Sequence, residues 1–216
     1  MNQKERVQSH AEELANSIVH GAGIFLSVVG LAVAVVFASF TKDPWKIVSV
    51  SIHGSSLVAL YSTSTLYHSI RSERLKYIFR IIDHCAIYFV IAGSYTPFTL
   101  VVLRGVWGWS LFGVIWALAI AGIFLKVFFK RRRFRMFSTA IYLVMGWLCV
   151  IAIGPLVARL PIGGVIWLVT GGIFYTFGVV FYLWQRIPFH HSIWHLFVLA
   201  GSISHYFAVL FYVVPM

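Results

Sequence analysis

Two histidines at the start of the last apolar segment have the clearest potential for chemistry. His191 and His195 are four residues apart, so in a helix their imidazoles lie one above the other on the same face. Both lie one to two turns inside a segment that is apolar enough to enter a membrane. Titratable groups at that depth are costly unless they pair with another group or bind a ligand. The pair therefore predicts partners on other segments of the chain.

The composition predicts the kind of scaffold that holds this pair. Of the 216 residues, 60% are hydrophobic and only 11% are charged, whereas a soluble domain carries about 25% charged residues. This deficit predicts an integral membrane protein. Cys85 and Cys149 both fall in apolar runs, so they predict neither a disulfide framework nor a cysteine zinc site. The polar start of the chain, Met1–Asn16, predicts that no signal peptide is cleaved.

Seven apolar segments can be counted along the chain. Each is close to the roughly 20 residues that a helix needs to cross the hydrocarbon of a bilayer, and the connections between them are short. We therefore expect an all-α bundle of seven transmembrane helices that forms one integral membrane domain over residues 1–216. The expected spans are residues 17–40, 46–70, 77–101, 106–128, 137–157, 162–184 and 191–215.

The basic residues predict the orientation of this bundle. Of the 17 Lys and Arg residues, thirteen fall on one side of the spans and four on the other. Because cytoplasmic loops are rich in Lys and Arg, we expect the N-terminus in the cytoplasm and the C-terminus outside. The run Lys130–Arg133 predicts contact with anionic lipid headgroups and not with nucleic acid, since no soluble basic domain accompanies it.

This orientation places four polar side chains at one depth. His68 lies about one turn before the cytoplasmic end of the second segment, and Asp83 lies about one turn after the start of the third. His191 and His195 enter from the same side. At a rise of about 1.5 Å per residue, all four lie at nearly the same depth although they come from three helices.

Three imidazoles and a carboxylate at one depth predict a metal site. Three histidine nitrogens suit Zn²⁺ and leave a fourth position for water. Asp83 would hold that water and accept its proton, and Ser64, four residues before His68 on the same face, could hydrogen-bond a developing oxyanion. Two alternatives stay open. The histidines could be packing residues that are hydrogen-bonded to neighbouring helices, or they could form a bis-imidazole haem site, which would leave Asp83 and Ser64 without a role.

The same residues carry a resemblance to a known family. The segments Ser64–Thr65–Leu66–Tyr67–His68 and His191–Ser192–Ile193–Trp194–His195, with Asp83 between them, resemble the hemolysin III-like family. That family belongs to the progestin and adipoQ receptor group, which forms a wider superfamily with the alkaline ceramidases. The likeness covers nearly the whole chain. It extends to Glu13–Leu14–Ala15–Asn16 with His20, and to Ala92–Gly93–Ser94–Tyr95–Thr96–Pro97–Phe98.

The resemblance implies a zinc ion held by His68, His191 and His195, with Asp83 at the zinc-bound water and Ser64 beside it. It also implies a hydrolytic activity on a membrane lipid, because relatives cleave lipid amides such as ceramide. The expected function is therefore a zinc-dependent hydrolase of a lipid amide or ester. A non-enzymatic regulator or sensor of membrane lipids with structural zinc, and a cytolysin, remain the alternatives.

Two further sets of polar residues have open roles. Glu13 is either a solvated carboxylate at a helix start, where the helix dipole favours it, or a partner of the metal site together with Asn16. His53 and His205 are expected about 21–22 Å further toward the outside than the metal site. They are either unrelated core histidines or a second polar locus on a proton or water route.

Overall fold

The chain folds into a bundle of long helices. The computed structural model describes residues 8–128 and 133–216 and contains no strand within these residues. The predicted contacts of Lys130, Arg131 and Arg132 lie outside the described residues. The helices are α1 (His10–Phe40), α2 (Pro44–Ser69), α3 (Glu73–Pro97) with the π-helical turn η1 (Phe98–Val102), α4 (Val106–Phe128), α5 (Arg133–Trp147), the 3-10 turn η2 (Leu148–Ala152), α6 (Ile153–Arg159), α7 (Ile162–Leu183), α8 (His190–Ala208) and the π-helical turn η3 (Val209–Val213).

Local sequence signals begin the first two helices. Ser9 caps α1, because its hydroxyl accepts a hydrogen bond from the Glu12 backbone N–H while the Glu12 carboxylate accepts one from the Ser9 N–H. Asp43 caps α2 by accepting a hydrogen bond from the Trp45 N–H, with Pro44 at the first helical position. The predicted first span therefore begins seven residues early, at His10 and not at residue 17.

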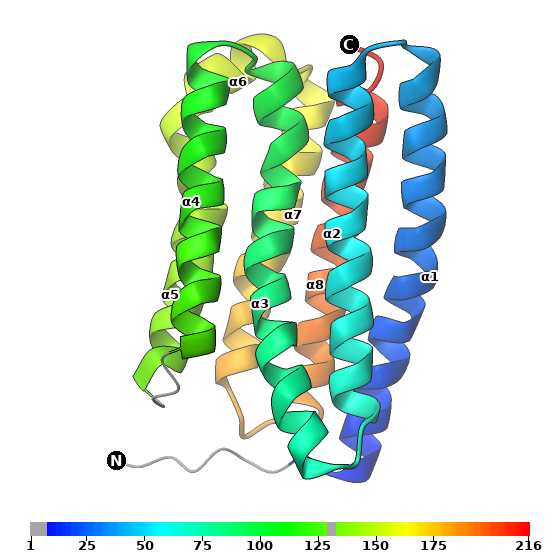
Figure 1. The fold of residues 1–216 in the computed structure, drawn as a ribbon, viewed down its shortest axis with the longest axis vertical. Helices are drawn as coiled ribbons and strands as arrows, with labels where there is room; N and C mark the ends of the chain where they lie inside the picture. The colour runs from blue at the N-terminus through cyan, green and yellow to red at the C-terminus, as the bar shows by residue number, and fades with distance from the viewer. Residues whose placement is uncertain (1–7, 129–132) are drawn as a thin grey trace.

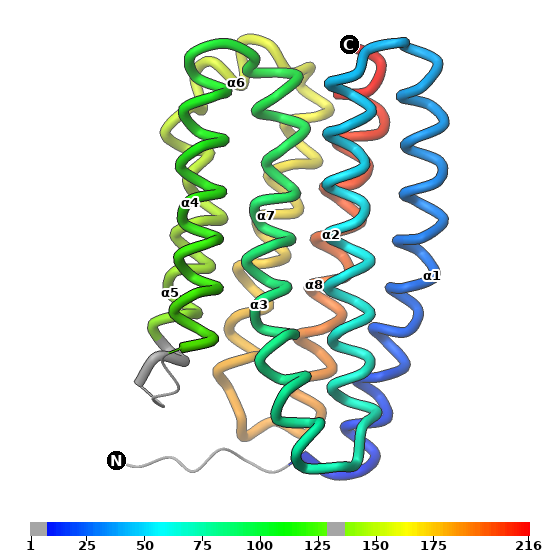
Figure 2. The backbone as a smooth tube through the Cα atoms, viewed as in Figure 1, coloured from blue at the N-terminus to red at the C-terminus, as the bar shows by residue number. Residues whose placement is uncertain are grey.

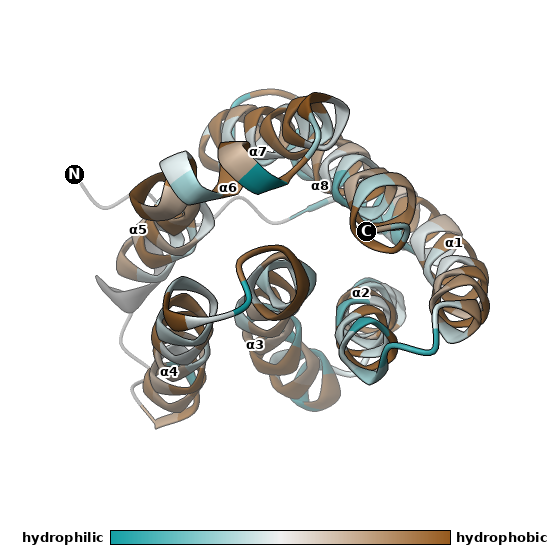
Figure 3. Ribbon diagram, turned by 90° about the horizontal axis from the view of Figure 1, so that it is seen from above, coloured by the Kyte–Doolittle hydropathy of each residue, from teal (hydrophilic) through white to brown (hydrophobic). Residues whose placement is uncertain are grey.

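Successive helices run in opposite directions along the bundle. Figures 1 and 2 show that α1, α3 and α8 begin, and α2 and α7 end, at the same end of the molecule. Helix α1 packs against both α2 and α8, and α2 packs against α3 on its other side, an order that Figure 3 shows from above. The helix starts and ends that carry the predicted site residues therefore meet at one end.

Six of the helices, and not seven, are long and apolar enough to cross a membrane within the described part of the chain. The predicted span 46–70 corresponds to α2, which has 26 residues but does not reach the apolarity of the others. The count of seven apolar spans is therefore wrong for this helix. The reason is that α2 turns a polar face into the bundle, with buried Lys46, Ser49, His53, Ser56, Ser64 and His68.

The other long helices show the opposite arrangement. Helices α1, α4 and α7 expose large apolar side chains, among them Phe25, Ile120 and Phe177, which are 59–69% exposed. Figure 3 shows brown, apolar residues on the outer surfaces of these helices. Such extended apolar surfaces are stable against lipid and not against water. The chain is a multi-pass integral membrane protein.

Candidate metal centre

Three histidines from two helices meet at one end of the bundle. His68 comes from the last turn of α2, and His191 and His195 come from the first two turns of α8. One ring nitrogen from each lies within 4.8 Å of the others. The ring centroids are 4.5 Å apart for His191 and His195, and 5.1–5.2 Å apart between His68 and each of them. The three rings therefore form a compact triangle that could hold a metal ion.

The dimensions of this triangle fit a small tetrahedral cation. The Nε2 atoms of His68 and His195 are 3.1 Å apart. Two nitrogens bound to zinc at 2.0–2.1 Å in a tetrahedral site are about 3.4 Å apart, so little movement separates the observed arrangement from a ligand set. The three predicted ligands are thus brought together, whereas the structure itself contains no ion.

Glu13 fixes the chemical form of His68. Its Oε2 lies 2.6 Å from His68 Nδ1, so the ring N–H donates to the carboxylate and Nε2 keeps its lone pair for a metal. The other oxygen of Glu13 accepts a hydrogen bond from Lys76 Nζ at 2.8 Å. Glu13 also lies in the first turn of α1. Of the two roles left open by the sequence, the structure places Glu13 as a partner of the metal-site histidine.

Asn16 links α1 to the other ligand helix. Its side chain is fully buried, and Oδ1 accepts a hydrogen bond from the Ser192 hydroxyl at 2.6 Å. Its amide nitrogen donates to Gln8 Oε1 and lies 3.3 Å from His68 Nδ1. A single side chain on α1 therefore contacts both the α2 and the α8 side of the histidine cluster.

Glu12 holds the start of α8 in place. Its Oε1 accepts a hydrogen bond from the Phe189 backbone N–H at 2.9 Å. Phe189 is the N-cap residue of α8 and has a positive φ of 56°, a conformation that is strained for a residue other than glycine. The carboxylate also lies where the dipole of α8 favours negative charge. The same side chain thus caps its own helix and fixes the backbone two residues before His191.

His20 is a fourth histidine beside the cluster. Its ring centroid lies 3.6 Å from that of His195, and it contacts Tyr61 edge to face. Neither of its ring nitrogens has a hydrogen-bond partner among the described residues. The sequence signal for this placement was the spacing of Glu13, Asn16 and His20, which puts all three on one face of α1.

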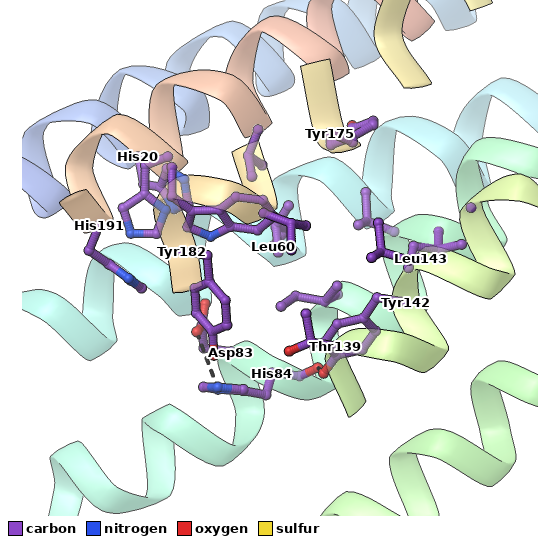
Figure 4. A pocket seen from close by; sticks show the side chains of 18 of the residues that line it. His20, Leu60, Asp83, His84, Thr139, Tyr142, Leu143, Tyr175, Tyr182 and His191 are labelled. Atoms are coloured by element: carbon purple, nitrogen blue, oxygen red, sulfur yellow. Dashed lines mark hydrogen bonds and ion pairs between the residues drawn. The ribbon is translucent and has the colours of Figure 1, made fainter. Parts of the chain in front are cut away.

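Asp83 lies in the same region but outside the ligand triangle. It is 9% exposed, and its Oδ2 is 3.6 Å from His84 Nδ1 (Figure 4). The Ser64 hydroxyl is close enough to interact with the Asp83 carboxylate but makes no hydrogen bond of regular geometry with it. His84 Nδ1 donates to the Arg80 carbonyl at 2.6 Å, so His84 is held away from the triangle, as its position next to Asp83 in the helix predicted.

Comparisons with known proteins decide the family. The family model described as haemolysin-III related matches residues 8–206. The chain belongs to this family. It is 51% identical over 203 residues to the hemolysin-3 homolog of Bacillus subtilis (strain 168), an alignment that covers 94% of this chain and 95% of that protein.

Two other relatives extend the comparison. Hemolysin-3 of Bacillus cereus is 48% identical over 204 residues, with 94% of this chain and 93% of that protein covered. The human monocyte to macrophage differentiation factor is 30% identical over 204 residues, with 92% and 83% covered. These relatives confirm the predicted membership of the hemolysin III-like part of the progestin and adipoQ receptor group.

In this haemolysin-III family member, a large cavity adjoins the histidine triangle. It has a volume of about 910 Å³, and its walls include His191 and His195 from the triangle as well as Asp83. Figure 4 shows His20, His191 and Asp83 around one end of it, with Tyr142 and Leu143 of α5 further along. The remaining walls are mainly apolar and aromatic side chains of α3, α5, α7 and α8, including Leu60, Val90, Ile91, Tyr95, Trp147, Trp194 and Val198.

The second pair of predicted histidines lies deeper in the bundle. His53 is 2% exposed, and neither of its ring nitrogens has a partner among the described residues. His205 lines the far part of the cavity, and its Nε2–H donates to the Leu168 carbonyl at 3.2 Å. The two rings are close enough to interact electrostatically. Neither ring faces lipid, while the proton or water route suggested for them stays a prediction.

Proposed function

We propose that this protein is a zinc-dependent hydrolase of a membrane lipid amide or ester. The observation that carries the proposal is that the ring nitrogens of His68, His191 and His195 cluster at the wall of a cavity that Asp83 also lines. At about 910 Å³, the cavity has the size of known sites for drug-sized ligands. Its apolar walls suit acyl chains, and its polar end suits the bond to be cleaved.

The chain's own residues would divide the work as follows. The three histidines hold the ion through neutral nitrogens, and Glu13 keeps His68 in the form that can bind it. Zinc, when bound, supplies a Lewis acid and lowers the pKa of a water molecule. Asp83 accepts the proton that this water loses when its oxygen adds to the lipid carbonyl carbon, and then gives it to the leaving nitrogen or oxygen as that bond breaks. Ser64 orients the Asp83 carboxylate or donates to the developing oxyanion.

We also propose that α2 crosses the membrane as a seventh span. Its 26 residues extend about 39 Å as a helix, enough for the hydrocarbon core. Its polar face is buried in the bundle between α1 and α3, so lipid does not meet those side chains. The distribution of Lys and Arg supports an N-terminus in the cytoplasm and a C-terminus outside, which puts the histidines near the cytoplasmic side.

The test combines metal analysis with lipid release. Purified parent protein, His191→Ala and Asp83→Asn are incubated with a defined ceramide and a defined phospholipid, and released fatty acid is measured. The parent should contain one zinc per chain and release fatty acid, His191→Ala should lose both, and Asp83→Asn should keep zinc but lose release. A zinc-loaded parent that cleaves no lipid amide or ester would overturn the proposal.

A second candidate is a non-enzymatic lipid regulator in which zinc has a structural role. The observation that favours it is that the histidine triangle joins α2 to α8, while Glu12, Glu13 and Asn16 of α1 bind to both sides of that joint. A metal there would lock three helices together. This function predicts that chelation lowers the melting temperature of a protein that shows no lipid release. Because the names of the two Bacillus relatives refer to haemolysis, erythrocyte lysis is a useful third measurement.

A further inference from the structure

The mouth of the cavity carries positive charge close to the candidate site. Arg80 of α3 and Lys126 of α4 both line the cavity that His191 and His195 line. They come from different helices, and Lys126 lies in the last turn of α4. The fold therefore brings two cations to the same opening, although they are 46 positions apart in the sequence.

Both cations are placed by contacts with other residues of the cavity wall. The Arg80 guanidinium lies over the ring of Tyr77, 5.8 Å from its centroid, and Tyr77 itself lines the cavity. Lys126 is close enough to Asp83 to interact with its carboxylate. A charge held near the proposed proton acceptor and facing the cavity lies where the polar part of a lipid would sit.

Other basic residues at this end of the molecule do not share that position. Arg71 and Arg74 are exposed near the start of α3, but they do not line the cavity as it is formed by the described residues. A general excess of positive charge on the cytoplasmic side would involve all four residues equally. The cavity distinguishes Arg80 and Lys126 from the other two, which makes Arg71 and Arg74 a natural control.

We propose that Arg80 and Lys126 form an anion subsite at the cavity mouth, so that the preferred ligand is a lipid with an anionic headgroup. Arg and Lys bind phosphate and carboxylate oxygens through charge-assisted hydrogen bonds, which are stronger than neutral ones. Acyl chains would occupy the apolar part of the cavity while the headgroup stays at the mouth. The subsite names the substrate class of the hydrolase proposed above and rests on that function for its catalytic meaning, but not for binding itself.

Binding of lipids that cannot be hydrolysed tests the subsite separately from turnover. The probes are a diether phosphatidic acid, which is anionic, and a diether phosphatidylcholine with the same chains, which has no net charge. Native mass spectrometry of the zinc-loaded protein in detergent gives the dissociation constant of each. We expect the parent to bind the anionic lipid about tenfold more tightly. Equal binding of the two lipids would overturn the proposal.

Matched variants locate the effect. The double variant Arg80→Gln with Lys126→Gln should lose the preference, whereas Arg71→Gln with Arg74→Gln should keep it at the same change in net charge. Zinc content of each variant, measured in the same samples, checks that the fold is retained, and each single variant at 80 or 126 should lose part of the preference. An equal loss in both double variants would contradict a subsite and show a general effect of surface charge.

Two further readings separate the remaining explanations. Inorganic phosphate at the same concentration as the lipid should compete weakly, since it lacks the chains that fill the cavity. Competition as strong as that of the lipid would overturn the assignment to a lipid headgroup. If the preference is present but ester-linked lipids are not cleaved, the subsite stands and the hydrolase proposal fails. If neutral lipids are cleaved without any binding preference, the hydrolase stands and the subsite fails.

Discussion

Replacing Glu13 with glutamine removes the one negative charge that contacts the candidate metal ligands. The carboxylate accepts the His68 Nδ1–H at 2.6 Å, which fixes the ring form and makes Nε2 a stronger ligand. Loss of such a carboxylate partner weakens metal affinity by about 10–100-fold, or about 1.4–2.7 kcal/mol. Because glutamine has nearly the same shape, packing around the residue should change little. The expected result is zinc binding that is weaker by this factor.

The assay is competition for zinc between the purified protein and a chelator of known affinity. Lys76→Gln is the matched control, since it removes the partially exposed ion pair between Lys76 and Glu13 (2.8 Å) but leaves the hydrogen bond to His68. Such a pair contributes about 0.2–1 kcal/mol, so the control should change zinc affinity by less than about fivefold.

Two results would refute this reasoning. Zinc affinity of Glu13→Gln within about twofold of the parent would show that the carboxylate does not support a metal ligand. An equal loss in Lys76→Gln would show that the charge balance at the surface matters, and not the contact with His68. Either outcome would return Glu13 to the simple role of a carboxylate at a helix start.

Three other predictions concern stability. Gly23→Ala should lower the free energy of unfolding by about 1–3 kcal/mol, because the added Cβ would lie 2.5 Å from the Tyr61 ring, whereas Gly21→Ala, with nothing within 4 Å, should be neutral or slightly stabilising; thermal unfolding in detergent compares the two. Removing zinc with a chelator should lower the melting temperature of the parent, by the equivalent of about 4 kcal/mol if zinc had been present at 1,000 times its dissociation constant, and should leave His195→Ala unchanged. Ser9→Ala should cost about 1 kcal/mol through the lost cap, and amide hydrogen exchange should speed up in the first turn of α1 and hardly at all in α4.

The sequence predicted the helices well where their signals are local. Apolar runs of about 20 residues and polar connections mark the membrane helices without reference to any neighbour, and the caps at Ser9 and Asp43 are readable within a few residues. The same local reasoning failed for α2. Its apolarity is lower than that of the other helices because its polar face is hidden by α1 and α3, and hydropathy along one segment does not include its neighbours.

The sequence by itself also determined that His191 and His195 share a helical face, because a spacing of four is a property of one helix. Only the tertiary structure decided that His68 completes a triangle with them, that Glu13 reaches across from α1 to its ring, and that Glu12 holds the backbone at Phe189. The cavity beside this cluster belongs to the same class. These features depend on which helices lie side by side and on how each is rotated about its axis, and those quantities are set by packing between segments far apart in the chain.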